Sequence, residues 1–436
     1  MPTNHSDKNE KKNFIRENIV KKPERKERMI RQLIKLVVSA VIFGFVATMT
    51  AIFARPGLEK LMLKESESTR ESISIPKDTP ELTETLSSTE TSELTIETES
   101  IEQIVHSIID HYDYSVKELK TMYQNLAELC EDFDHCAVSV DSVKNAKDWF
   151  DNPVEKSGHY SGIIVAKTQT EAIILCPSDA AKEADSLRVR FLDGELSSAA
   201  LRALDRISGL AVISVSSEEI EKETWEKIRP AVLGNSYQAN RGDIIIAVGS
   251  PSGSPYSSVY GSISYIARDI SVTDGVARIL HTDMKADASA GSFIINTEGE
   301  VIGWMTRKYT KDESRFSNIA YGISDYKLLL ENMINALPTP YLGIKGAEVS
   351  AEMLEGGMPE GIYIGEVLEN SPVYNAGIQP GDVLVRLGGS RIKGLVEFRN
   401  TLYALPAGEE TELLIMRNNG KDEYKELRFH IPIGSR

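Results

Sequence analysis

The chain has 436 residues, of which 41% are hydrophobic, so it is long enough for two or three domains with sizeable cores. Its formal net charge of −16 argues against nucleic-acid binding, because a surface that follows phosphates needs clustered Lys and Arg. The sequence shows no metal-ligand cluster, phosphate-binding loop or catalytic carboxylate pair, so we expect no metal and no cofactor.

A basic N-terminal segment precedes a long apolar run. Residues 1–35 hold eleven Lys or Arg against five Asp or Glu, and residues 36–54 contain no charged side chain. At ~1.5 Å per residue, a helix of that length spans roughly the ~30 Å hydrocarbon core of a bilayer. We therefore expect one transmembrane helix over residues 36–54, with the basic tail cytoplasmic and everything after it extracytoplasmic, at the cell membrane. A buried core helix and a cleaved signal peptide are the alternatives, and the long charged leader disfavours the second.

The composition then changes twice before the pattern of a folded domain begins. Residues 65–100 contain sixteen Ser or Thr and ten acidic side chains, which predicts a disordered acidic linker over residues 55–100. Apolar side chains then recur at helical spacing from residue 101 to residue 133, which predicts a helical stem within residues 101–156. That stem is either a self-pairing coiled coil or an amphipathic helix lying on the next domain.

The chain has three cysteines. Cys130 and Cys136 are close enough in sequence to close a short loop as a disulfide outside a cell. Cys176 lies in an apolar, strand-like run and is expected to be a buried thiol.

From residue 157 the apolar pattern becomes an alternation, in short segments separated by Gly, Asn and Asp turns. Examples are residues 161–166, 172–176, 187–191 and 210–215. Many short strands at this spacing predict a mainly β fold, either a barrel or a sandwich.

Three segments of this region resemble the HtrA-type trypsin-like serine proteases that carry a C-terminal PDZ domain. Residues 161–165 (Ser-Gly-Ile-Ile-Val) are similar to the family's opening barrel strand, Ser-Gly-Val-Ile-Ile. Residues 242–253 match the family's Gly-Asp-x-Val-x-Ala-Ile-Gly-Asn-Pro-x-Gly, and residues 260–264 (Tyr-Gly-Ser-Ile-Ser) match the strand after it. The resemblance implies a chymotrypsin/trypsin-like double β-barrel over residues 157–335.

An active enzyme of this kind needs a Ser nucleophile, a His base and an Asp that orients the His. Carried over by motif, the His position is Asp179, in Ile-Leu-Cys-Pro-Ser-Asp-Ala-Ala, and the Asp position is Gly209, before Leu-Ala-Val-Ile. Counting back from Gly-Glu-Val-Ile-Gly at residues 299–303, the Ser position is Ala290. All three are replaced together, so the resemblance implies a pseudoprotease. The alternative is an active serine endopeptidase that uses Ser289 and an unconventional base.

The turn that would hold the oxyanion is altered as well. Ala288 and Ser292 stand where the family has glycines, and Phe293 stands where it has proline. His281 is the nearest histidine in sequence, but we expect it on the strand that leads into this loop. Asp179 would need strong burial to act as a base, because an unperturbed Asp has a pKa of ~3.9.

The last segment resembles a PDZ domain, which we predict over residues 336–434. Residues 340–344 (Pro-Tyr-Leu-Gly-Ile) are similar to its carboxylate-binding loop, and residues 371–384 match Ser-Pro-Ala-x-x-Ala-Gly-Leu-x-x-Gly-Asp-Val-Ile. Backbone N–H groups of the loop can cradle a C-terminal carboxylate while the peptide adds as a strand. The expected peptide-binding residues are Tyr341, Leu342, Gly343, Ile344, Phe398 and Leu402.

The last two of these lie on a helix predicted over residues 396–404. Phe398 and Leu402 could equally belong to the core, with the neighbouring Arg399 facing the peptide. The apolar loop suggests a ligand with a hydrophobic C-terminal side chain.

The sequence therefore predicts a single-pass membrane protein that recognises extracytoplasmic polypeptides in envelope quality control or signalling. The resemblance implies a homotrimer. A purely structural surface scaffold with an unused PDZ groove is a further possibility.

Overall fold

The computed structural model describes residues 72–79, 115–147, 153–308, 315–420 and 423–436. The predicted cytoplasmic tail, the predicted transmembrane segment and residues 80–114 lie outside these ranges. Across the described ranges, no helix is both long and apolar enough to cross a bilayer. Ser72–Arg436 forms one compact unit.

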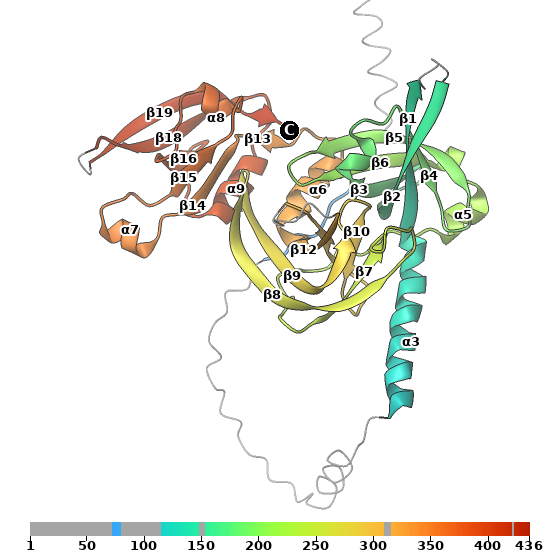
Figure 1. Cartoon of the computed structure of the whole chain (residues 1–436). Coiled ribbons are helices and arrows are strands. Elements are labelled where there is room, and N and C mark those ends of the chain that lie inside the picture. The colour runs from blue at the N-terminus through green and yellow to red at the C-terminus, as the bar shows by residue number, and fades with distance from the viewer. Residues whose placement is uncertain (1–71, 80–114, 148–152, 309–314, 421–422) are drawn as a thin grey trace, which may run out of the picture. The chain divides into compact units, whose positions relative to one another are not determined.

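A closed antiparallel barrel follows helix α3. Its strands run in the order β1-β2-β3-β6-β5-β4, and pairing of β1 with β4 closes it (Figure 1). Inward residues of the strands are β-branched or aliphatic, and alternation places them on the buried face. The strands are β1 (Ala137–Lys147), β2 (Pro153–Lys167), β3 (Glu171–Pro177), β4 (Ser186–Arg190), β5 (Leu196–Asp205) and β6 (Leu210–Ser216). The short helices α4 (Ser178–Ala181), η2 (Ser217–Glu219) and α5 (Lys222–Lys227) follow β3 and β6.

The second barrel repeats this plan in the order β10-β11-β12-β9-β8-β7, closed by pairing of β10 with β7. Its longest feature is the β8–β9 hairpin, yellow in Figure 1, whose last paired residues are Val272 and Gly275. The strands are β7 (Ile244–Gly249), β8 (Val259–Val272), β9 (Gly275–Asp287), β10 (Ser292–Ile295), β11 (Val301–Met305) and β12 (Phe316–Gly322). η3 (Ser324–Tyr326) and α6 (Lys327–Ile334) follow β12.

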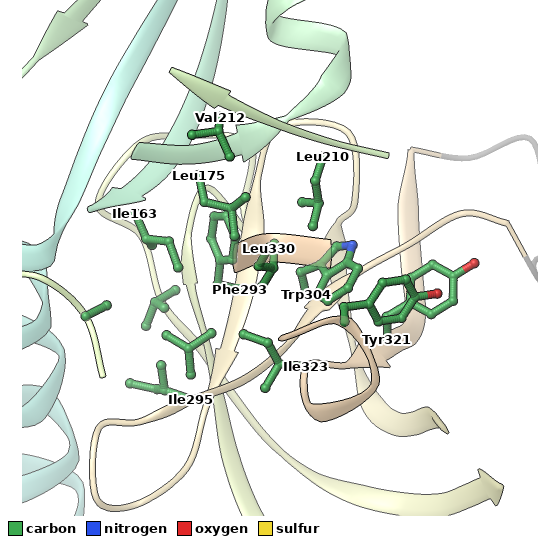
Figure 2. Packing of buried hydrophobic residues seen from close by; sticks show 14 of the residues in the cluster. Ile163, Leu175, Leu210, Val212, Phe293, Ile295, Trp304, Tyr321, Ile323 and Leu330 are labelled. Atoms are coloured by element: carbon green, nitrogen blue, oxygen red, sulfur yellow. The ribbon is translucent and has the colours of Figure 1, made fainter. Parts of the chain in front are cut away.

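One hydrophobic core is shared by the two barrels. Side chains from β2, β3, β10, β11, β12 and α6 meet in it, as Figure 2 shows for Ile163, Leu175, Phe293, Trp304 and Leu330. Trp304, Tyr321 and Tyr326 form an aromatic trio in the same cluster, with ring centroids 4.8–5.3 Å apart. The predicted double β-barrel is therefore the observed fold.

The C-terminal part is a six-stranded antiparallel sheet with helices packed against it; five strands follow in the order β14-β15-β16-β18-β19, and β17 pairs with β16. Its elements are β13 (Pro340–Tyr341), β14 (Ile344–Glu348), α7 (Ala351–Glu355), β15 (Ile362–Val367), α8 (Pro372–Asn375), β16 (Val383–Leu387), β17 (Ser390–Arg391), α9 (Leu395–Tyr403), β18 (Glu410–Asn418), β19 (Tyr424–Pro432) and β20 (Gly434–Ser435). The helix predicted over residues 396–404 is α9, shifted by one residue at each end.

The predicted stem is only partly helical. Helix α3 (Val116–Phe133) begins with a capping box between Ser115 and Glu118, and the short helix η1 (Asp134–Cys136) follows it. Residues 137–147 and 153–156, however, belong to the first barrel hairpin. The predicted boundary at residue 157 is wrong because strand β1 begins at Ala137, where Val138 and Val140 already follow the two-residue period of a strand.

The two halves of helix α3 differ in how they relate to the two structures predicted for the stem. Its C-terminal half packs on the barrels through Leu126, Leu129 and Phe133, as an amphipathic helix lying on the next domain would. Its N-terminal half carries apolar side chains that are exposed, among them Val116 at 84%.

The predicted disordered linker is wrong for residues 72–79. Ile75 is buried in the shared core, and its N–H donates to Glu331 Oε2 at 3.1 Å. Asp78 pairs with the buried Lys327 ammonium at 2.8 Å. The composition of the linker did not indicate this contact, because Ile73 and Ile75 are only two apolar side chains in a segment that is otherwise mostly polar.

All three cysteines are free thiols. Cys130 lies 3.8 Å from the Tyr260 hydroxyl, so the predicted alternative of a Cys130–Cys136 disulfide is not what the structure has. Cys176 is fully buried as expected, and burial raises the pKa of its thiol to about 12.

Candidate functional site

Two of the positions assigned to the catalytic triad, Asp179 and Gly209, line one cleft at the junction of the barrels together with Ser289. Asp179 lies on α4, directly after β3, and Gly209 lies in the turn between β5 and β6. The Ser178 N–H donates to the Gly209 carbonyl oxygen at 2.8 Å, which brings these two segments together. The cleft is lined by Asp179, Gly209 and Ser289. The fold thus brings three residues that are far apart in the sequence to one cleft.

The loop between β9 and β10 carries Ala290. The Ala290 carbonyl oxygen accepts a hydrogen bond from the Ser161 N–H at 2.7 Å, which fixes the loop against β2 of the first barrel. Gly291 follows with a φ of +92°, and a Cβ there would lie 2.1 Å from the Ser161 carbonyl oxygen. Only glycine fits this turn.

A buried carboxylate organises the same loop from inside. Asp287 is 1% exposed, and its Oδ1 accepts from the Ser289 N–H at 2.9 Å and from the Ala290 N–H at 3.1 Å. Its Oδ2 lies 3.0 Å from Arg315 Nε. The Ser292 hydroxyl donates to the Asp287 carbonyl oxygen at 2.6 Å.

These bonds use the donors that an oxyanion hole would need. In trypsin-like enzymes the oxyanion is held by the N–H of the nucleophile and the N–H two residues before it. Here these are the N–H of Ala290, which donates to Asp287, and the N–H of Ala288, which donates to the Arg315 carbonyl oxygen at 2.9 Å. Both donors are therefore engaged within the protein.

The cleft also lacks a recognisable base. Each histidine of the described ranges lies elsewhere: His135, His159, His281 and His430 are absent from the cleft lining. His159 Nδ1 is 2.7 Å from Asp141 on the first hairpin, and the His281 ring lies against Tyr265 on the second barrel. The Ser289 hydroxyl is buried without a hydrogen-bond partner, so nothing is placed to take its proton.

The titratable groups that do line the cleft are one carboxylate and several cations. Asp179 faces the same cleft as Arg206, Arg307 and Lys308. Neither Asp179 nor Lys308 forms a hydrogen bond to Ser289 Oγ.

The second predicted site is the loop of the C-terminal domain that leads into β14. Gly343 has a φ of +89°, and a Cβ there would lie 2.2 Å from Ser371 Cβ, so glycine is required. The N–H groups of Leu342, Gly343 and Ile344 donate to a carboxylate, at 2.9, 2.8 and 3.0 Å, and that carboxylate is the side chain of Asp274. Sequence reasoning missed Asp274, since Asp274-Gly275 reads only as an ordinary hairpin turn.

Phe398 and Leu402 were predicted on the wall of this groove. Both side chains are fully buried in the cluster that also holds Leu342 and Ile344, so they belong to the core, which was the stated alternative. Arg399 is buried too, and its Nη1 donates to Asp325 Oδ1 at 2.8 Å instead of facing solvent. Tyr341, by contrast, remains partly exposed beside the loop.

Comparison with known proteins agrees with this architecture. The family model "Trypsin-like peptidase domain" matches residues 160–303, and the model "PDZ domain" matches residues 340–427. "Serine protease Do-like HtrB" of Bacillus subtilis (strain 168) is 26% identical over 326 residues, covering 68% of this chain and 69% of that protein. "Serine protease Do-like HtrA" of the same organism is 28% identical over 294 residues, covering 63% and 64%. The chain thus spans about two thirds of the length of these relatives.

A solved structure shares the fold. "HtrA-type protease AlgW with decapeptide" aligns with a TM-score of 0.52 and 18% identity, over 71% of this chain and 98% of that chain. The order of the two domains, their motifs and the relatives agree. The chain therefore has the domain architecture of the HtrA-type serine proteases, a trypsin-like peptidase domain followed by a PDZ domain.

Proposed function

We propose that this protein is a pseudoprotease that binds polypeptides through its PDZ domain, with the trypsin-like domain as a catalytically silent scaffold. The observation that carries the proposal is the cleft itself. Gly209 and Ala290 carry no side chain that can act in catalysis, Asp179 forms no hydrogen bond to Ser289 Oγ, and the oxyanion donors are already bonded. Removing triad members leaves in general only the small rate gain from oxyanion stabilisation and binding, and here the oxyanion donors are engaged as well.

A labelling experiment tests inactivity directly. We expect a fluorophosphonate probe to leave the purified protein unlabelled, and unfolded casein to remain uncleaved, because no base is placed at Ser289 Oγ. Ser289→Ala is the matched control, and it should behave like the wild-type chain. Stoichiometric labelling that disappears in Ser289→Ala would overturn the proposal.

The alternative is an active serine endopeptidase, and the names of the relatives, which are serine proteases, favour it. In this case Ser289 would be the nucleophile, and the candidate bases are the cleft side chains Asp179 and Lys308. Activity lost in Ser289→Ala and also in Asp179→Asn or Lys308→Met would establish this reading.

Peptide recognition rests on the loop geometry. The N–H groups of Leu342, Gly343 and Ile344 converge on one carboxylate, which is the arrangement that captures a C-terminal carboxylate in PDZ domains. The solved relative carries a decapeptide in its title. A library of peptides with free C-termini should show a sequence preference, and a library bound without any preference would refute recognition of this kind.

We further propose that the protein is anchored by residues 36–54, with its folded domains outside the cytoplasm, acting in envelope quality control or signalling. The support is the uncharged run behind a basic leader. A protease added to intact cells should digest the folded domains but spare the N-terminal tail. A homotrimer is part of the same proposal, and the mass of the detergent-solubilised protein in light scattering tests it.

A further inference from the structure

The PDZ loop is occupied by a segment of the protein's own second barrel. The tip of the β8–β9 hairpin enters the groove, and the Asp274 carboxylate accepts from three successive N–H groups of the loop. A C-terminal peptide would use these same donors for its terminal carboxylate. Asp274 itself is 2% exposed, so little solvent reaches the site.

Two further hydrogen bonds, one between backbone groups and one to a side chain, join the hairpin to the edge strand of the PDZ sheet. The Asp274 N–H donates to the Ile344 carbonyl oxygen at 2.8 Å, and the Gly346 N–H donates to Ser271 Oγ at 3.1 Å. An added peptide strand makes bonds of this kind along the same edge, because a sheet edge offers alternate N–H and C=O groups. The hairpin therefore occupies the strand position as well as the carboxylate position.

The side chains next to Asp274 complete the fit. Val276 is 5% exposed and belongs to the PDZ hydrophobic cluster, together with Leu342, Ile344 and Phe398. Gly275 lies against helix α9, where an added Cβ would be 3.4 Å from side-chain atoms of Arg399. An apolar side chain beside a carboxylate is the chemistry that a PDZ groove selects in a ligand with a hydrophobic C-terminus.

We propose that Asp274 is an internal ligand that closes the PDZ groove, so that C-terminal peptides bind only by displacing the tip of the β8–β9 hairpin. This inference rests on the proposed peptide recognition and adds its regulation. Since only the open state can bind, the apparent dissociation constant exceeds the intrinsic one by the reciprocal of the open fraction. Removing the internal carboxylate is expected to tighten peptide binding at least tenfold.

The conformation of Asp274 decides which variants are informative. Its φ is +59°, in the left-handed region where Asn and Gly are tolerated better than Ala. Asp274→Asn removes the charge and keeps the shape, whereas Asp274→Gly removes the side chain without backbone strain. Asp243→Asn is the matched control, because it neutralises an exposed barrel carboxylate far along the chain from the hairpin tip.

The probe is a fluorescein-labelled decapeptide pool that ends in Val with a free carboxylate, and the same pool as carboxamides is the negative control. Anisotropy is measured on the full chain in detergent. We expect both Asp274 variants to bind the free-carboxylate pool at least tenfold more tightly than wild type and Asp243→Asn. Equal, measurable affinity in all four proteins would overturn the internal ligand while leaving peptide recognition intact.

Hydrogen exchange tests the internal ligand in the case where none of the four proteins binds the peptide pool. If no protein binds the pool, peptide recognition fails, and the internal ligand is then judged by exchange at the amides of Leu342, Gly343 and Ile344. Slow exchange in wild type and Asp243→Asn, accelerated at least tenfold in Asp274→Asn and Asp274→Gly, supports the internal ligand. Exchange that does not differ among the four proteins refutes it.

Discussion

Asp287→Ala tests whether the loop between β9 and β10 is held by its buried carboxylate. The substitution leaves the N–H groups of Ser289 and Ala290 without their acceptor, at an average cost of about 1–3 kcal/mol each. It also removes the pair with Arg315, whose side chain is 58% exposed, so this part is worth about 0–1 kcal/mol. Together these give a loss of about 2–7 kcal/mol in the free energy of unfolding.

The assay is urea unfolding at pH 7, followed by the fluorescence of Trp304 and the other tryptophans. Arg315→Ala is the matched control, because it breaks only the exposed half of the interaction and should cost under about 1 kcal/mol. The reasoning fails if Asp287→Ala costs less than about 1 kcal/mol, or if Arg315→Ala costs as much as Asp287→Ala.

Three further predictions concern the barrels and the short helix η1. Gly291→Ala places a Cβ 2.1 Å from the Ser161 carbonyl oxygen at a φ of +92°, so we expect a loss of about 3 kcal/mol or more and a sharply lower melting temperature; an unchanged one would contradict the geometry. Phe293→Ala should cost about 3–5 kcal/mol in urea unfolding, because the side chain is 1% exposed, while Phe293→Leu should cost under about 1.5 kcal/mol. Burial of the Asp134 carboxyl and, second, the charge of Glu131 raise the pKa of Asp134 to about 6. Because this pKa is higher in the folded than in the unfolded chain, ionisation of Asp134 lowers the free energy of unfolding as the pH rises from about 4 through about 6. Asp134→Asn should therefore add about 1 kcal/mol at pH 7.5 after allowance for solvent screening, and nothing at pH 3.5; an equal gain at both pH values would contradict this.

The fold was largely predictable because the sequence repeats local patterns that one structure satisfies. Two-residue alternation with Gly and Asp turns marks the barrel strands, and the Ser-Pro to Gly-Asp-Val-Leu segment at residues 371–384 marks the PDZ domain. The first hairpin was missed although Val138 and Val140 alternate, because a helical pattern directly precedes it. The docking of residues 72–79 was missed because two isoleucines are too few to stand out in an acidic segment.

Some residues of the candidate sites could likewise be predicted from the sequence, and others could not. Motif order singled out Asp179, Gly209 and Ser289, and all three line one cleft. The roles of Asp287 and Asp274 could not be read from sequence, because each depends on backbone N–H groups that only the folded chain brings to it. Contacts between segments about seventy residues apart, such as Asp274 with Gly343, leave no local pattern.

The backbone of the cleft bears on whether substitutions could install a catalytic triad here. Asp179→His, Gly209→Asp and Ala290→Ser together would supply the three missing side chains. Yet Gly209 has a φ of +79°, a conformation in which a residue with a Cβ is strained, and a new Ser at position 290 would inherit an N–H already bonded to Asp287. Three side-chain substitutions would therefore not be enough to build an oxyanion hole, because the main-chain N–H groups of residues 288 and 290 already donate to other groups of the protein.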